Sequence, residues 1–169
     1  SSGNPSIGSF AGSSGILVQR FVPPASPFLP TAVCIAGYAD QVAGVGAAGY
    51  DVVIFSDLNG LPGTLLGTIP AVPAAPGAFP GSWMTTSVSG LVPLVNGPFW
   101  AGPRITTDVH FGLDFDATAA PGLQVVLPPD ATDGSAGYAF TGGIAEIQVV
   151  GLSGADAAIP ALSGLGLAA

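Results

Sequence analysis

The chain has 169 residues, of which 49% are hydrophobic and only 7% charged, with no lysine and a net charge of −8. Its two basic side chains, Arg20 and Arg104, are too few to neutralise a phosphate backbone, so nucleic acid is not expected as a partner. The 26 Gly and 17 Pro interrupt every apolar run, and none approaches the ~20 residues that span a bilayer, so no membrane span is expected in this sequence.

Residues 1–15 are rich in Gly and Ser, with Ile7 and Phe10 as isolated apolar side chains. Such a segment cannot bury itself as a single strand, so 1–15 is predicted to be a flexible N-terminal arm. In an assembly, the arm is a candidate donor strand that adds to the open sheet edge of a neighbour, with Ile7 and Phe10 as assembly contacts.

Between 16 and 150, short runs of apolar residues alternate with turn signals such as Asn59-Gly60, the pattern of β-strands in one domain. The clearest strand is 107–115, where Val109, Phe111, Leu113 and Phe115 fall on one face and Asp108, His110 and Asp114 on the other. The predicted strands are 16–22, 31–36, 49–56, 64–69, 83–88, 99–105, 107–115, 124–127, 137–141 and 144–150. About nine or ten short strands without an amphipathic helix predict an all-β fold, a jelly-roll-like antiparallel β-sandwich.

Two segments inside this region carry further predictions. The proline-rich segment 70–80 cannot donate ladder hydrogen bonds at its prolines, so it is predicted to be an extended surface loop. The single cysteine, Cys34, lies in an apolar run and is predicted to be a buried thiol, with an intermolecular disulfide as the alternative.

Residues 151–169 form a small-residue, apolar C-terminal tail. The tail is predicted to be either a strand that adds to a neighbour or the remnant of a sorting motif. If it is a strand, its apolar side chains are assembly contacts. These are Ile159, Leu162, Leu165 and Leu167.

The turn Asp57-Leu58-Asn59-Gly60-Leu61-Pro62-Gly63, followed later by the strand residues Phe99-Trp100, resembles a recurring β-sandwich or jelly-roll module of exported bacterial surface proteins. Ile159-Pro160-Ala161-Leu162-Ser163 is similar to the Ile-Pro-Thr-Leu-Ser motif that opens bacterial carboxy-terminal sorting signals, with Ala161 in place of Thr. The apolar span and arginine cluster of that family do not follow in this sequence. The resemblance implies a secreted protein, located outside the cell or at its surface.

Groups that titrate or attack near neutral pH are scarce, because the chain has one His, one Cys, one Glu and no Lys. The strand pattern places His110 on a polar face, so a solvated or interface histidine is favoured over a catalytic one. Asp114 and Asp116 are two residues apart and share one face of a strand; a charged strand end is the favoured interpretation, and a Ca²⁺ site or a catalytic pair is the alternative. We expect neither enzyme activity nor a cofactor.

Core or subunit-interface packing is the favoured role of both tryptophans, and the alternative for Trp83, which follows a Gly/Pro-rich loop, is an exposed ring that contacts a sugar. An ordinary domain is about 25% charged, so the small charge fraction predicts surface hidden in contacts between copies of the chain. The sequence thus predicts a secreted, non-catalytic structural subunit that assembles into a homopolymeric filament or layer by terminal-strand exchange. The alternative is a carbohydrate-binding or adhesive module with polysaccharide as its partner.

Overall fold

The computed structural model describes residues 14–39, 49–73, 82–105, 109–111, 113–114, 123–140, 144–145 and 147–154. Every element in this part of the chain is a β-strand, and all strand pairs are antiparallel. The strands are β1 (Gly15–Phe21), β2 (Phe28–Ala39), β3 (Gly49–Leu58), β4 (Leu61–Pro73), β5 (Ser82–Ser87), β6 (Phe99–Ile105), β7 (Val109–Phe111), β8 (Leu113–Asp114), β9 (Gln124–Leu127), β10 (Tyr138–Ala139), β11 (Ile144–Ala145) and β12 (Ile147–Ser153).

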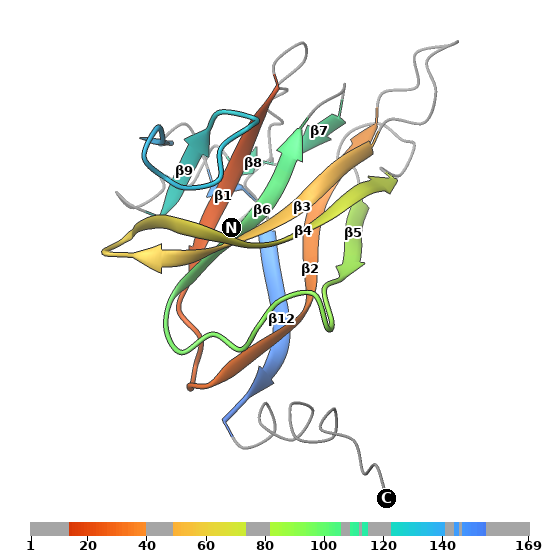
Figure 1. Ribbon diagram of the computed structural model, residues 1–169. Helices are drawn as coiled ribbons and strands as arrows, with labels where there is room; N and C mark the ends of the chain where they lie inside the picture. Colours follow the sequence, from red (N-terminus) through yellow and green to blue (C-terminus); the bar gives the residue numbers. More distant parts are fainter. Residues whose placement is uncertain are drawn as a thin grey trace, which may run out of the picture.

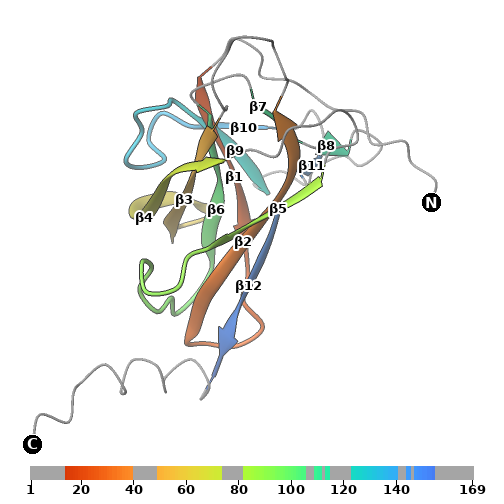
Figure 2. The same cartoon turned by 90° about the vertical axis from the view of Figure 1, so that its right-hand side faces the viewer.

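The strands form two layers (Figures 1 and 2). One layer is a six-stranded sheet in the order β10-β9-β1-β6-β3-β4. The other is a smaller sheet in the order β12-β2-β5, with β7 also pairing with β2; we call β12, β2 and β5 the small sheet. A separate pair joins β8 to β11. The predicted antiparallel β-sandwich is therefore confirmed.

The core between the layers is built by side chains that alternate along each strand. In β5, Met84 and Thr86 are buried while their neighbours are exposed, as the strand period of two requires. Phe28 of β2 stacks on Phe99 of β6 across the two sheets, with ring centroids 5.8 Å apart. This interdigitation of two inner faces is what holds a β-sandwich together.

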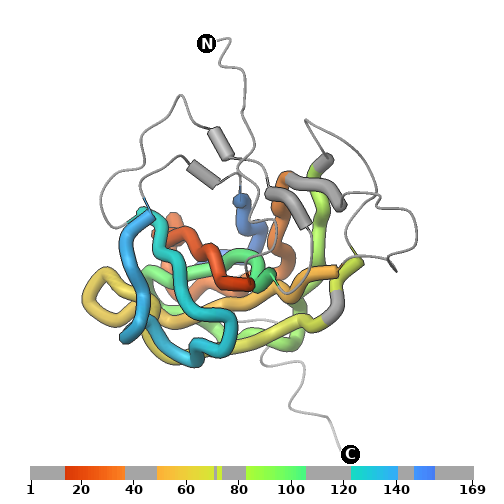
Figure 3. Tube along the Cα trace, turned by 90° about the horizontal axis from the view of Figure 1, so that it is seen from above, coloured from red at the N-terminus to blue at the C-terminus, as the bar shows by residue number. Residues whose placement is uncertain are grey.

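The six-stranded sheet is also buried on its outer face, over a second core around Trp100. Leu65 of β4 and Ala131 pack against this second core. Residues 128–137, which follow β9, fold back over the sheet, and the Leu65 amide donates to the Thr132 carbonyl at 3.0 Å. Figure 3 shows this segment, in cyan to blue, beside the yellow-green of β4. The covering segment therefore connects the β9 end of the sheet to the opposite edge strand, β4, over the second core.

The central strand β6 approaches β1 very closely at Gly102. A Cβ at this position would collide with the carbonyl oxygen of Leu17, so only glycine fits without a backbone shift. Pro103 follows directly and has no N–H to donate to β1. The β1–β6 ladder therefore lacks pairs at Gly102 and Pro103, although the register before this gap is the same as the register after it.

The β3–β4 hairpin closes through Asn59 and Gly60, whose φ angles are +54° and +85°. Positive φ at both central residues is typical of a type I′ turn, which favours the Asn-Gly pair. The predicted turn at this position is confirmed, and β4 then runs from Leu61 to Pro73.

Several predicted boundaries were wrong. Pro70 and Pro73 belong to β4 and not to a loop; an edge strand tolerates them because one side of its backbone needs no donor. The predicted strand 107–115 is divided between β7, which pairs with β2, and β8, which pairs with β11. The predicted tail begins too early, since β12 continues to Ser153, and Gly15, assigned to the arm, opens β1.

Candidate functional site

The small sheet contains no Asp, Glu, Lys or Arg in any of its three strands. The ion pairs that the structure describes both lie in the six-stranded sheet, and the exposed acids Asp130 and Asp133 lie in the segment that covers it. Apart from Asp114 of β8, the charged residues in the described part of the chain therefore lie on one layer of the sandwich.

The outer face of the small sheet is exposed, as the alternation of β5 and β12 requires. Trp83 is 49% exposed, Val150 53% and Leu152 40%. Thr85 and Gln148 are exposed on the same face, each beside Cys34 in the ladder. This face is a neutral surface of aliphatic, hydroxyl and amide groups around one indole.

Trp83 and Trp100 have opposite environments. Trp100 is fully buried in the second core, while Trp83 lies in β5 opposite Ala36 of β2 with half of its surface open. Trp83 therefore does not belong to the core of this chain. Its exposure suits either of the other roles predicted for it, an interface between subunits or a contact with sugar.

The prediction for Cys34 was wrong in its burial. The residue is half-buried and its thiol is free. Its neighbours Val33 and Ile35 point into the core, so the period of two turns Cys34 to the outer face. Thr85 Oγ1 lies 3.4 Å from its Sγ as a hydrogen-bond donor.

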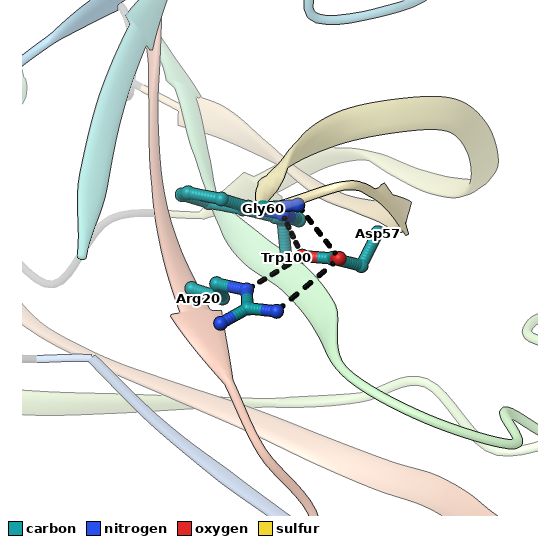
Figure 4. Close-up of polar contacts among 4 residues, drawn as sticks. All are labelled: Arg20, Asp57, Gly60 and Trp100. Carbon is teal, nitrogen blue, oxygen red and sulfur yellow. Dashed lines mark hydrogen bonds and ion pairs between the residues drawn. The ribbon is translucent and has the colours of Figure 1, made fainter. Parts of the chain in front are cut away.

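Asp57, near the end of β3, accepts four hydrogen bonds (Figure 4). Arg20 of β1 donates Nε to Oδ1 at 2.6 Å and Nη2 to Oδ2 at 3.2 Å. The Trp100 indole donates to Oδ1 at 3.0 Å, and the Gly60 amide donates to Oδ2 at 3.0 Å. One carboxylate thus joins β1, β6 and the hairpin turn.

These donors stabilise the charged form of Asp57. The Arg20 guanidinium lowers the pKa of the Asp57 carboxyl, and the Gly60 and Trp100 N–H groups act in the same direction against the opposing effect of burial. The same contact raises the pKa of Arg20. A carboxylate with a lowered pKa and four donors is a poor proton acceptor, so the cluster suits a structural role better than general acid–base catalysis.

The second arginine is also paired within the chain. Arg104 of β6 lies opposite Asp51 of β3, and its Nη1 is 3.5 Å from Oδ2 of Asp51. Both cations are therefore held beside acids of the six-stranded sheet. Sequence analysis did not identify either pair, because their members are 37 and 53 residues apart.

Other predicted site residues fall on parts of the chain about which less can be said. Asp114 ends β8, opposite Ile144 of β11, whereas Asp116 lies outside the described residues. Among the residues that the structure describes, no group of three or more His, Cys, Asp or Glu side chains is placed to hold a metal ion. The predicted assembly contacts also lie outside them: Ile7, Phe10, Ile159, Leu162, Leu165 and Leu167.

Two further findings concern membrane spans and similarity to known proteins. Within the described ranges, no helix has the length and apolar character needed to cross a bilayer. No family model matches the chain, and no curated protein or solved structure is significantly similar to it.

Proposed function

We propose that this protein is a secreted, non-catalytic structural subunit that assembles with copies of itself into an extracellular filament or layer. The observation that carries the proposal is the small sheet, whose three strands contain no charged residue and expose Trp83, Val150 and Leu152 on the outer face. An uncharged face with exposed apolar side chains on a folded domain is a candidate interaction surface.

Charge limits which surfaces two copies of the chain can share. Each chain carries a net charge of −8, so two copies repel each other unless their acids stay apart. Repulsion between exposed charges is largely screened beyond about 8 Å at physiological ionic strength. The three strands of the small sheet carry none of these charges, so contact through them places no like charges directly against each other.

Terminal-strand exchange is the proposed means of cohesion. Residues 155–169 begin one residue after the end of β12, an edge strand of the small sheet, and their sequence is apolar apart from Asp156 and Ser163. An extended segment of 15 residues reaches roughly 50 Å, enough to lie along the sheet edge of a neighbour. The extracellular setting is supported by the likeness of Ile159-Pro160-Ala161-Leu162-Ser163 to a sorting motif.

The test is negative-stain electron microscopy with light scattering on the intact chain and on two deletions, of 1–13 and of 155–169. Both deletions leave every described strand in place. We expect regular fibres or sheets from the intact chain and their loss in at least one deletion. Monodisperse monomers from the intact chain would defeat self-assembly, while unchanged fibres in both deletions would defeat strand exchange alone.

A carbohydrate-binding module is the second candidate, favoured by the exposure of Trp83 beside the hydroxyl of Thr85. An indole face packs against a pyranose ring, and hydroxyls bind its edge. Sedimentation with insoluble polysaccharides tests it: binding by a monomer that is lost in Trp83→Ala and retained in Trp83→Phe would support this candidate over the first.

A further inference from the structure

The strand β12 is an exposed edge of the small sheet. It pairs with β2 from Ile147 to Ser153, and on its other side it pairs with no strand among the described residues (Figures 1 and 2, blue). A row of backbone N–H and C=O groups along such an edge is a template for another strand. An edge of this kind is usually protected unless it has a partner.

The edge strand β4 of the six-stranded sheet is protected against the addition of another strand. It contains Pro62, Pro70 and Pro73, and the β3–β4 register shifts at three places. In addition, the Leu65 amide is hydrogen-bonded to the Thr132 carbonyl of the covering segment. Prolines, irregular register and a covering segment are the devices that prevent strand addition.

In the part of the chain that the structure describes, none of these devices protects β12. Its sequence, from Ile147 to Ser153, has no proline and no charged residue. The one register shift between β12 and β2 places the extra residue, Thr31, in β2, so the backbone of β12 itself remains regular. Gln148, Val150 and Leu152 are exposed along it, two of them apolar.

The strand is also complementary to itself. An antiparallel pair of β12 strands about a twofold axis at Val150, its middle residue, aligns all seven positions of each copy. Val150 then faces Val150 of the second copy, and Gln148 faces Leu152. Since every such pair is uncharged, no like charges are placed directly opposite each other.

We propose that β12 pairs antiparallel with β12 of a second copy of this chain, so that two small sheets join into one continuous sheet. This interface deepens the proposed function and rests on it: it names the edge through which the subunits first associate. It differs from stacking of two outer faces, because here only the edges meet and Trp83, at the far side of the sheet on β5, stays open to solvent.

The native cysteine distinguishes these two arrangements. In the joined sheet, the two copies of β2 are separated by two β12 strands, so the Cys34 residues lie at least about 14 Å apart at the usual strand spacing. A disulfide needs Cα atoms within roughly 7 Å. The joined sheet therefore forbids a Cys34 disulfide, whereas stacked faces bring the central strands together and allow one.

The first experiment compares Val150→Glu with Leu58→Glu by sedimentation equilibrium over a concentration series. Both variants add one negative charge at an exposed apolar side chain, but Leu58 lies at the tip of the β3–β4 hairpin, away from the small sheet. Two glutamates on facing strands repel each other at close range, so we expect Val150→Glu to weaken self-association by about tenfold or more. Leu58→Glu should stay within about twofold of the parent. Equal effects of the two variants would overturn the proposal.

The second experiment places cysteines in a Cys34→Ser background and oxidises the purified protein. Opposite residues of an antiparallel pair have Cα atoms about 4.5–5.5 Å apart, so Val150→Cys and the double variant Gln148→Cys/Leu152→Cys should form covalent dimers. Thr85→Cys, on the same face but in β5, should not.

The outcomes separate the two proposals. A parent chain that stays monomeric at every concentration rejects self-assembly itself. A parent that associates but gives no covalent dimer from either β12 variant, or that cross-links through Thr85→Cys or native Cys34, rejects the β12 interface and leaves self-assembly standing.

Discussion

The indole Nε1 of Trp100 donates to Asp57 Oδ1 at 3.0 Å, and through this bond the second core is tied to the β3–β4 hairpin. Arg20 approaches the same carboxylate from β1, so one acid connects β1 and β6 to the turn that starts β4. The buried indole thus has a partner for its N–H, as a fully buried tryptophan requires. The carboxylate is in turn half of the shortest ion pair in the described residues.

Replacing Asp57 with Asn should lower the free energy of unfolding by about 2 kcal/mol. The guanidinium of Arg20 loses its counter-ion, and an NH₂ group, which cannot accept, takes the place of one carboxylate oxygen. The 30% exposure of Arg20 keeps the loss below that of a fully buried pair. Asp51→Asn is the matched control, since its pair with Arg104 is longer, at 3.5 Å, and should cost less than about 1 kcal/mol. Urea unfolding measures both; equal losses would contradict the special role of Asp57.

Stability should fall in acid through Asp57. Its pKa is lowered in the folded state from an ordinary value of 3.8, so the folded chain binds the proton less readily than the unfolded one. The resulting stabilisation is complete above the unfolded pKa and is lost as the pH falls below about 5 toward the folded value. The urea midpoint of the parent should therefore drop more steeply between about pH 6 and pH 3 than that of Asp57→Asn. Parallel curves would show that this carboxyl is not coupled to folding.

Substitution of Gly102 by Ala should destabilise the sandwich by roughly 2 kcal/mol or more, since the new methyl group would collide with the Leu17 carbonyl and separate β1 from β6. Gly97→Ala is the control, because no atom lies within 4 Å of the place that its new methyl group would take, and it should change stability by less than about 0.5 kcal/mol. Thermal unfolding by circular dichroism compares the two. A Gly102→Ala variant as stable as Gly97→Ala would show that the strands can separate at no cost.

The two tryptophans should respond differently to a collisional quencher. Trp83 is 49% exposed and Trp100 is fully buried, so acrylamide should quench only the first efficiently. In Trp83→Phe the remaining fluorescence should be resistant to acrylamide, while unfolding in urea makes Trp100 accessible. Efficient quenching of folded Trp83→Phe would mean that the second core opens readily to solvent.

The strands were predictable where the period of two and turn residues agreed. The hairpin turn at Asn59-Gly60 illustrates this, because the residue pair itself selects the turn type. The second core was not predicted, since residues 128–137 contain turn residues and resemble a simple connection. One signal of the second core was present in the sequence. Residues 52–55 are four consecutive apolar residues, a run typical of a strand covered on both faces, and all four are buried.

The candidate site was predictable only in its components. Sequence alone shows that charges are few, but not that both arginines pair with acids of the same sheet, because those contacts connect residues 37 and 53 apart. Trp83 was identified as a surface residue only by its position after a Gly/Pro-rich loop. Cys34 was misplaced because small apolar neighbours on both sides of a strand conceal which face each residue occupies.

The unequal distribution of charge between the layers has a consequence for behaviour at a boundary between water and an apolar phase. The small sheet carries no charge to dehydrate, so it can leave water at low cost, whereas Asp130 and Asp133 over the other layer keep their hydration. Adsorbed molecules would then share one orientation. A film of them would present an acidic surface to the solution and repel other anionic particles.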